Sequence, residues 1–135
     1  MRIYVDSAVV IYTVEQVAPY AEVVDSRLSA LDAVIVTSDL TRMECRVKPL
    51  REEKAALLRD FDDFFEGAVE DMVGLSREVV DSATRIRAQY GFKTPDALHL
   101  AVAVLSDCDV FLTNDHRLDR FSEISIEVVL PKATP

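Results

Sequence analysis

Four acidic residues, spread along the chain, have the side chains needed to hold a divalent cation. Mg²⁺ and Mn²⁺ prefer oxygen ligands, and a bound cation activates water for attack on phosphorus. Carboxylates that cluster without a cation repel one another and raise each other's pKa values. These residue types therefore predict metal-assisted hydrolysis of a phosphate ester, if the fold brings them together. The four are Asp6, Glu44, Asp96 and Asp115.

The predicted elements place all four acids near one edge of a sheet. In an open parallel sheet, ligands bind outside the carboxyl ends of the strands, near the point where the strand order reverses. Two of the acids follow predicted strands, one lies in the second turn of a predicted helix, and one lies in the first turn of another. The positions are Asp6 after a strand over 3–5, Asp115 after a strand over 109–113, Glu44 in the helix after a strand over 33–36, and Asp96 in a helix that begins near 94.

Strands alternate with helices along the whole chain, which predicts a mostly parallel sheet covered by helices on both faces. No linker or internal repeat is visible, so we expect one domain over 1–135. Further strands are predicted over 69–75 and 126–130. The first predicted helix follows Asp6 and Ser7 and closes at Pro19. Further helices are predicted over 21–31, over 40–47 with capping residues at 37–39 and an interruption at Pro49, over 52–65, over 76–91, and over 94–105 with Thr94 as N-cap. We expect the tail over 131–135 to be frayed.

Composition narrows the class of protein. Half of the 135 residues are apolar and only 3 are Gly, which argues against a disordered chain. No apolar run approaches the roughly 20 residues of a membrane span, and the N-terminus lacks a signal-peptide pattern, so we expect a cytoplasmic protein without a membrane partner. Cys45 and Cys108 match no zinc spacing, His99 and His116 do not complete a metal cluster, and we expect buried, reduced thiols.

Each acid also has a simpler explanation. Asp6 and Asp115 are suited to cap following helices, because Asp is a favoured N-cap residue. Asp96 suits the positive end of its helix, and Glu44 on a helix is ordinarily a solvated side chain. The metal hypothesis therefore depends on the joint placement of the four residues.

The order and spacing of four segments resemble the PIN-domain ribonucleases, and within them the VapC toxins of toxin–antitoxin pairs. The resemblance covers nearly the whole chain. The segments are Tyr4-Val5-Asp6-Ser7-Ala8, Thr37-Ser38-Asp39-Leu40-Thr41-Arg42-Met43-Glu44, Thr94-Pro95-Asp96-Ala97-Leu98-His99-Leu100-Ala101-Val102-Ala103, and Phe111-Leu112-Thr113-Asn114-Asp115.

This resemblance implies an α/β fold, a three-layer α/β/α sandwich with a roughly five-stranded sheet. It implies a Mg²⁺- or Mn²⁺-dependent endoribonuclease that cleaves RNA, such as tRNA or rRNA, and inhibits translation. The four acids would be catalytic, with Asp6, Asp96 and Asp115 as metal ligands, and Thr113 and Ser7 would support the site. It further implies a homodimer and a cognate VapB-type antitoxin.

The net charge of −9 is unusual for an RNA-binding protein, because contacts with phosphates normally require basic residues. Basic side chains do lie beside three of the four acids in the sequence, and we predict RNA contacts for Arg42, Arg46, Lys93 and Arg117. A solvated face with ordinary ion pairs is the alternative for each of them.

Two other functions fit some of these features. A phosphoacceptor signalling domain also has an acidic Mg²⁺ pocket, but it needs paired acids after the first strand, and Asp6 is followed by Ser7 and Ala8. A catalytically silent PIN-like binding module, in which the carboxylates only cap helices, also fits this sequence.

Overall fold

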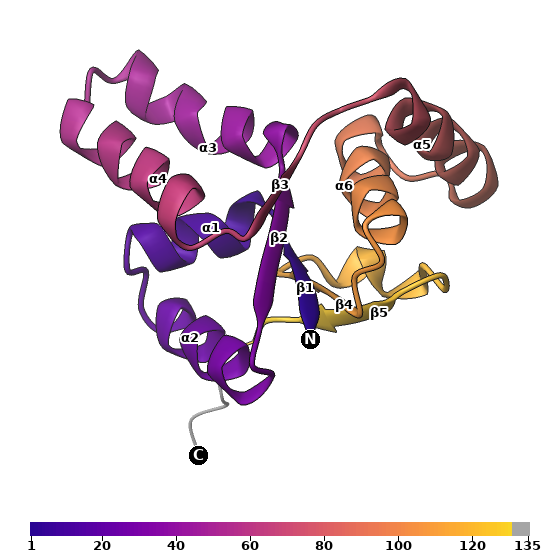
Figure 1. The fold of residues 1–135 in the computed structure, drawn as a ribbon, viewed down its shortest axis with the longest axis horizontal. Coiled ribbons are helices and arrows are strands. Elements are labelled where there is room, and N and C mark those ends of the chain that lie inside the picture. The colour runs from indigo at the N-terminus through magenta and orange to yellow at the C-terminus, as the bar shows by residue number, and fades with distance from the viewer. Residues whose placement is uncertain (131–135) are drawn as a thin grey trace.

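The computed structural model describes residues 1–130, which form a five-stranded sheet and six α-helices (Figure 1). The predicted tail over 131–135 lies outside the described residues. The strands are β1 (Arg2–Val5), β2 (Val34–Ser38), β3 (Asp71–Val73), β4 (Val110–Thr113) and β5 (Ser125–Val128). The helices are α1 (Ser7–Val14), α2 (Tyr20–Ala30), α3 (Asp39–Arg51), α4 (Ala55–Gly67), α5 (Arg77–Tyr90), α6 (Thr94–Leu105) and the 3₁₀ helix η1 (His116–Arg120).

The strand order is β3-β2-β1-β4-β5, and every pair of neighbouring strands is parallel. From β1 the chain moves outward to β2 and β3, and then crosses to the other side of β1 to form β4 and β5. The order therefore reverses between β1 and β4, which is where an open parallel sheet offers a binding site.

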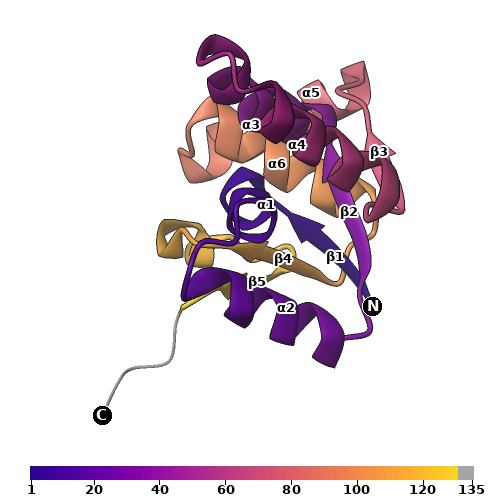
Figure 2. The ribbon, with the colours of Figure 1, turned by 90° about the vertical axis from the view of Figure 1, so that its left-hand side faces the viewer.

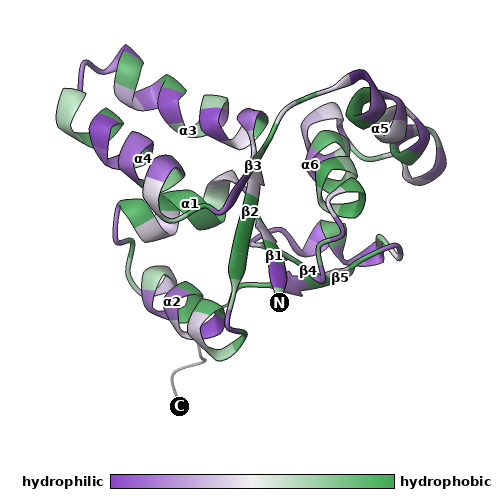
Figure 3. Cartoon of the chain, viewed as in Figure 1, coloured by the Kyte–Doolittle hydropathy of each residue, from purple (hydrophilic) through white to green (hydrophobic). Residues whose placement is uncertain are grey.

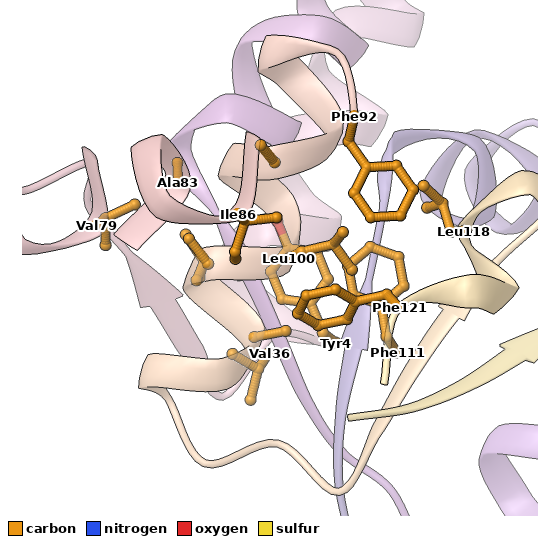
Figure 4. Packing of buried hydrophobic residues seen from close by; sticks show 14 residues of the cluster. Tyr4, Val36, Val79, Ala83, Ile86, Phe92, Leu100, Phe111, Leu118 and Phe121 are labelled. Atoms are coloured by element: carbon orange, nitrogen blue, oxygen red, sulfur yellow. The ribbon is translucent and has the colours of Figure 1, made fainter. Parts of the chain in front are cut away.

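Helices cover both faces of the sheet, as the pattern predicted: α5 and α6 lie on one face and α1 and α2 on the other (Figures 1 and 2). Alternation along β1 separates the two cores, since Tyr4 packs under α5 and α6 while Ile3 and Val5 face the opposite layer. Figure 4 shows Tyr4, Phe111 and Leu100 in the first core. Figure 3 shows β2 and α6 as largely apolar, and α3 and α4 as mixed. The three-layer α/β/α sandwich is thus present.

Three predicted helix boundaries were wrong. The first helix ends at Val14 and not at Pro19, and the turn after it holds Gln16 at a positive φ of 52°. Pro49 does not interrupt its helix, which continues to Arg51. Pro49 is buried in the last turn, and its missing N–H removes one hydrogen bond of the helix. The next helix begins at Ala55 and not at Glu52, since Glu53 adopts a positive φ of 56° that no α-helix accommodates.

Smaller differences concern caps and strand ends. Thr94 is the first helical residue and not the N-cap, which is Lys93. The third strand is confined to Asp71–Val73 because it pairs only with the end of β2. Ser76 and Gly91 cap α5, and Gly91 adopts the left-handed φ of 78° that glycine accepts without strain. Within residues 1–130, no helix has the length and apolar character needed to cross a bilayer.

Candidate active site

The four acids, from segments far apart in the sequence, line one small pocket of about 160 Å³. It opens beyond the carboxyl ends of β1 and β4, at the reversal of strand order. Asp6 and Asp115 come from the loops after these two strands, Glu44 from α3 and Asp96 from α6. The lining residues are Asp6, Ser7, Ala8, Glu44, Asp96, His99, Asn114, Asp115 and Leu118.

Asp6 is held from two sides. Its Oδ1 accepts a hydrogen bond from the backbone N–H of Val9 (3.2 Å), which makes Asp6 the N-cap of α1. Its Oδ2 accepts a bond from the Thr113 hydroxyl (2.6 Å). Burial raises the pKa of the Asp6 carboxyl above its usual value, and these hydrogen bonds only partly offset that effect.

Thr113 joins the loops after β1 and β4. Its hydroxyl donates to Asp6, and the same oxygen accepts a bond from the backbone N–H of Asp115 (3.1 Å). The side chain is fully buried. Thr113 therefore ties Asp6 to the segment that carries Asp115.

Asp115 is occupied by a neighbour on its own loop. The guanidinium of Arg117 donates to both carboxylate oxygens, at 2.6 Å in the shortest contact, and the Arg117 backbone N–H donates to Oδ1. These contacts lower the pKa of Asp115. The Arg117 side chain is 66% exposed, so little holds it in this position apart from the carboxylate.

Glu44 receives two hydrogen bonds on one oxygen. The Ser7 hydroxyl (2.5 Å) and Nε2 of His99 (2.7 Å) both lie against Oε1. Burial alone would raise the pKa of Glu44, but the bonds from His99 and Ser7 outweigh it and the pKa is lowered. Glu44 is consequently ionised at neutral pH.

Asp96, in the first turn of α6, has the least support from the protein. Among residues 1–130, no group donates a hydrogen bond to its carboxylate. Burial, and then the charge of Asp115, raise the pKa of Asp96. Its negative charge is therefore only weakly compensated by the protein.

The donor set suits a hard divalent cation. All four acids offer carboxylate oxygens, and a bound cation would favour the ionised forms of Asp6 and Asp96, whose pKa values are raised chiefly by burial. In the described part of the chain, no three His, Cys, Asp or Glu side chains are already grouped as a metal site. Asp115 would have to exchange Arg117 for the cation, since Arg117 contacts both of its oxygens.

The capping alternative is also correct for two of the acids. Asp6 caps α1 and Asp115 caps η1 through its backbone contact to Arg117. Capping and a role in the pocket are compatible, because each cap uses one carboxylate oxygen and the strand end still places the residue at the pocket.

The predicted RNA-contacting residues are scattered. Arg42 and Arg46 contact Asp62 of α4 at 3.3 and 2.8 Å, and neither lines the pocket. Lys93 is exposed just before α6, and Arg117 lies against Asp115. Their contacts with RNA remain a prediction.

Sequence reasoning missed four of the lining residues, the polar His99 and Asn114 and the apolar Ala8 and Leu118. His99 was set aside because it completed no metal-ligand spacing, yet it contacts Glu44 from three helical residues beyond Asp96. That i, i+3 spacing on one helix face was the available signal. Asn114 donates to the Tyr12 hydroxyl (2.9 Å) and lines the pocket beside Asp115.

Both cysteines are free, as expected, although Cys108 is only partly buried. Burial raises the pKa of both thiols, to about 11 for Cys108, which leaves them protonated and unreactive at neutral pH.

Solved structures with this fold include several toxin–antitoxin complexes. VapBC2 from Rickettsia felis, bound to a DNA fragment from its promoter, is 15% identical, with a TM-score of 0.78 over 95% of this chain and 98% of that chain. DNA-bound VapBC from Salmonella typhimurium is 19% identical, with a TM-score of 0.69 over 96% and 99%. Mycobacterium tuberculosis VapC20, a sarcin-ricin loop cleaving toxin, is 16% identical, with a TM-score of 0.69 over 91% and 98%.

Sequence comparison gives the family. No curated protein matches the chain. The family model of the PIN domain matches residues 3–124, a span that includes all four acids, strands β2, β3 and β4, and β1 apart from Arg2, whereas β5 lies beyond it. The chain therefore belongs to the PIN domain family.

Proposed function

We propose that this protein is a Mg²⁺- or Mn²⁺-dependent endoribonuclease, the toxin of a VapBC-type toxin–antitoxin pair. The observation that carries the proposal is the convergence of Asp6, Glu44, Asp96 and Asp115 on one pocket of a PIN domain. The sarcin-ricin loop cleaving activity named for a structural neighbour makes structured RNA a reasonable first substrate class.

In this proposal Asp6, Asp96 and Asp115 hold the cation, and Glu44 completes the ring of carboxylates directly or through a water. The cation, when bound, would supply the positive charge that stabilises the transition state on phosphorus. Thr113 keeps Asp6 in place, and the pair of bonds from Ser7 and His99 keeps Glu44 ionised and oriented. Leu118 gives the pocket an apolar wall.

The proposal includes the partners that the resemblance implied. A VapB-type antitoxin is supported by the neighbours, several of which are structures of toxin–antitoxin complexes. A homodimer and RNA contacts through Arg42, Arg46, Lys93 and Arg117 complete the proposal. Release of Arg42 and Arg46 from Asp62 would be required for those two side chains to bind phosphate.

The test is cleavage of labelled RNA by the purified protein. We expect products with Mg²⁺ or Mn²⁺ and none in excess chelator. Asp6→Asn and Asp96→Asn each remove a metal ligand and should abolish cleavage. Asp81→Asn is the matched control, because Asp81 is an exposed carboxylate on α5 outside the pocket.

Two results would refute the proposal. One is cleavage that survives in the Asp6→Asn/Asp96→Asn double variant or in chelator. The other is a folded protein that binds Mn²⁺ but cleaves none of a panel of rRNA and tRNA substrates, which would favour the catalytically silent binding module.

A further inference from the structure

Behind the pocket wall lies a chain of buried polar side chains that ends on Glu44. Nε2 of His99 lies 2.7 Å from Oε1 of Glu44, and Nδ1 of the same ring lies 2.6 Å from the Tyr4 hydroxyl. The Tyr4 hydroxyl lies 2.8 Å from the Ser38 hydroxyl. Tyr4 and Ser38 are fully buried, and His99 is 5% exposed. The chain thus connects β1, the N-cap of α3, α6 and the acid on α3.

The shortest contacts indicate the direction of the protons, because the Thr41 hydroxyl lies farther away, 3.4 Å from the Tyr4 oxygen and 3.5 Å from Nδ1 of His99. Oε1 of Glu44 accepts the bond from the Ser7 hydroxyl and lies 2.7 Å from Nε2 of His99, so Nε2 carries the proton between them. Burial raises the pKa of the Tyr4 hydroxyl, which keeps it protonated and able to donate to Nδ1. Ser38 can then donate to the Tyr4 oxygen while its own oxygen accepts from the backbone N–H of Thr41 (3.4 Å). If Tyr4 instead donated to Ser38, the Ser38 proton would lack an acceptor, because the Ser38 hydroxyl contacts only the Tyr4 oxygen and the backbone N–H of Thr41 among these groups.

In the described part of the chain, these hydrogen bonds leave one oxygen of Glu44 free of protein donors. Ser7 and His99 both occupy Oε1, and within residues 1–130 no group donates to Oε2. The carboxylate is therefore fixed by one oxygen, which leaves the other available to the pocket. Such outer hydrogen bonds set the orientation of groups at metal centres.

We propose that His99 is a positioning residue, held by Tyr4 as the Nε2–H tautomer, which fixes the Glu44 carboxylate toward the pocket. The role rests on the proposed metal-dependent function. Packing alone does not account for the arrangement, because the Tyr4 ring stacks on Phe111 with centroids 5.0 Å apart, and a phenylalanine would fill that space equally well. The Tyr4 and His99 rings meet edge to face with centroids 5.7 Å apart, and the hydroxyl adds the hydrogen bond to Nδ1 that a phenylalanine could not make.

The tautomer can be measured without metal or substrate. In ¹⁵N-histidine NMR of the whole chain, we expect His99 to show a protonated Nε2 and an unprotonated Nδ1. The chain has two histidines, so a His116→Gln variant assigns the signals. Tyr4→Phe should shift His99 away from this single tautomer, whereas Tyr90→Phe should not, because Tyr90 bonds Ser122 outside the pocket. An Nδ1–H ring or an imidazolium in the wild type would overturn the proposal.

Mn²⁺ affinity, measured by calorimetry, tests the positioning role. His99→Leu removes the donor and should weaken Mn²⁺ binding about 10- to 100-fold, the range found for outer-shell partners. His99→Gln retains a side-chain N–H donor of similar reach and should restore affinity to within about 3-fold of the wild type. Thermal melts of each variant identify loss of fold. If His99→Leu melts at a lower temperature than the wild type, the positioning role is tested by His99→Gln and Tyr4→Phe instead.

A double-mutant cycle separates positioning from general structural damage. If His99 acts through Glu44, His99→Leu should weaken Mn²⁺ binding little further when Glu44 is already Gln. Independent, multiplicative losses would overturn the proposal. If the wild type does not bind Mn²⁺, the proposed function is refuted, and the NMR result still tests the tautomer. If the wild type binds Mn²⁺ and cleaves RNA, and His99→Leu does so equally well, only the positioning role is refuted.

Discussion

Replacement of Thr113 by Val should destabilise the protein although the two side chains have nearly the same shape. The Thr113 hydroxyl makes a 2.6 Å bond to the buried Asp6 carboxylate and accepts the Asp115 N–H. A hydrogen bond to a charged group contributes about 1.5–3 kcal/mol, and a buried N–H left without a partner costs about 1–3 kcal/mol. Because the Asp115 loop is close to solvent and water can replace the second bond, we expect a loss of about 2–4 kcal/mol in the free energy of unfolding.

The assay is urea unfolding followed by circular dichroism, with the metal-free protein at neutral pH. For a domain of this size, each kcal/mol corresponds to about 3–5 °C in Tm, so thermal melts give an independent reading. Thr84→Val is the matched control, since Thr84 is exposed and its hydroxyl bonds only the Val80 carbonyl of its own helix. We expect the control to change stability by no more than about 0.5 kcal/mol.

Thr113→Ser provides the second comparison, because it retains the hydroxyl and removes the methyl group. It should recover more of the stability than Val does if the hydrogen bonds dominate. Equal losses for Thr113→Val and Thr84→Val, or a Ser variant less stable than the Val variant, would refute the reasoning that Thr113 links Asp6 to Asp115 through its hydroxyl.

Three further predictions concern the pocket and the core. Arg117→Ala should tighten Mn²⁺ binding by up to about 5-fold in calorimetry, because the exposed ion pair of Arg117 competes with the cation for Asp115 and contributes about 0–1 kcal/mol. Weaker binding by this variant would show that Arg117 assists the cation. Mn²⁺ at 100 times its Kd should stabilise the wild type by about 2.7 kcal/mol and raise its Tm, and Asp96→Asn should lose this gain; an equal rise in both proteins would place the cation elsewhere. Phe61→Ala, at a position that is 1% exposed, should cost about 3–5 kcal/mol in chemical unfolding, whereas Phe64→Ala, at a partly buried position on the same helix, should cost less.

Several features of the fold could be read from local patterns. The short apolar strands at 3–5 and 109–113 were predicted correctly because their residues are buried on both faces of a parallel sheet. Asp6 and Asp115 were placed at one edge of the sheet because each follows a strand, and the carboxyl ends of parallel strands share an edge. Helix ends were less accurate, because Gln16 and Glu53 adopt positive φ angles that their residue types do not announce.

The sequence by itself determined the order of strands and helices, the PIN-like segments and the four acids within those segments. The tertiary structure decided which contacts those acids make. The bond between His99 and Glu44 spans 55 residues, and the pairing of Arg46 with Asp62 joins two helices. Such pairs depend on how packed helices are rotated against one another, and small differences in packing decide that rotation. Periodicity along the chain fixes which face of a helix is buried, but the partner that a polar side chain meets there is set by the fold as a whole.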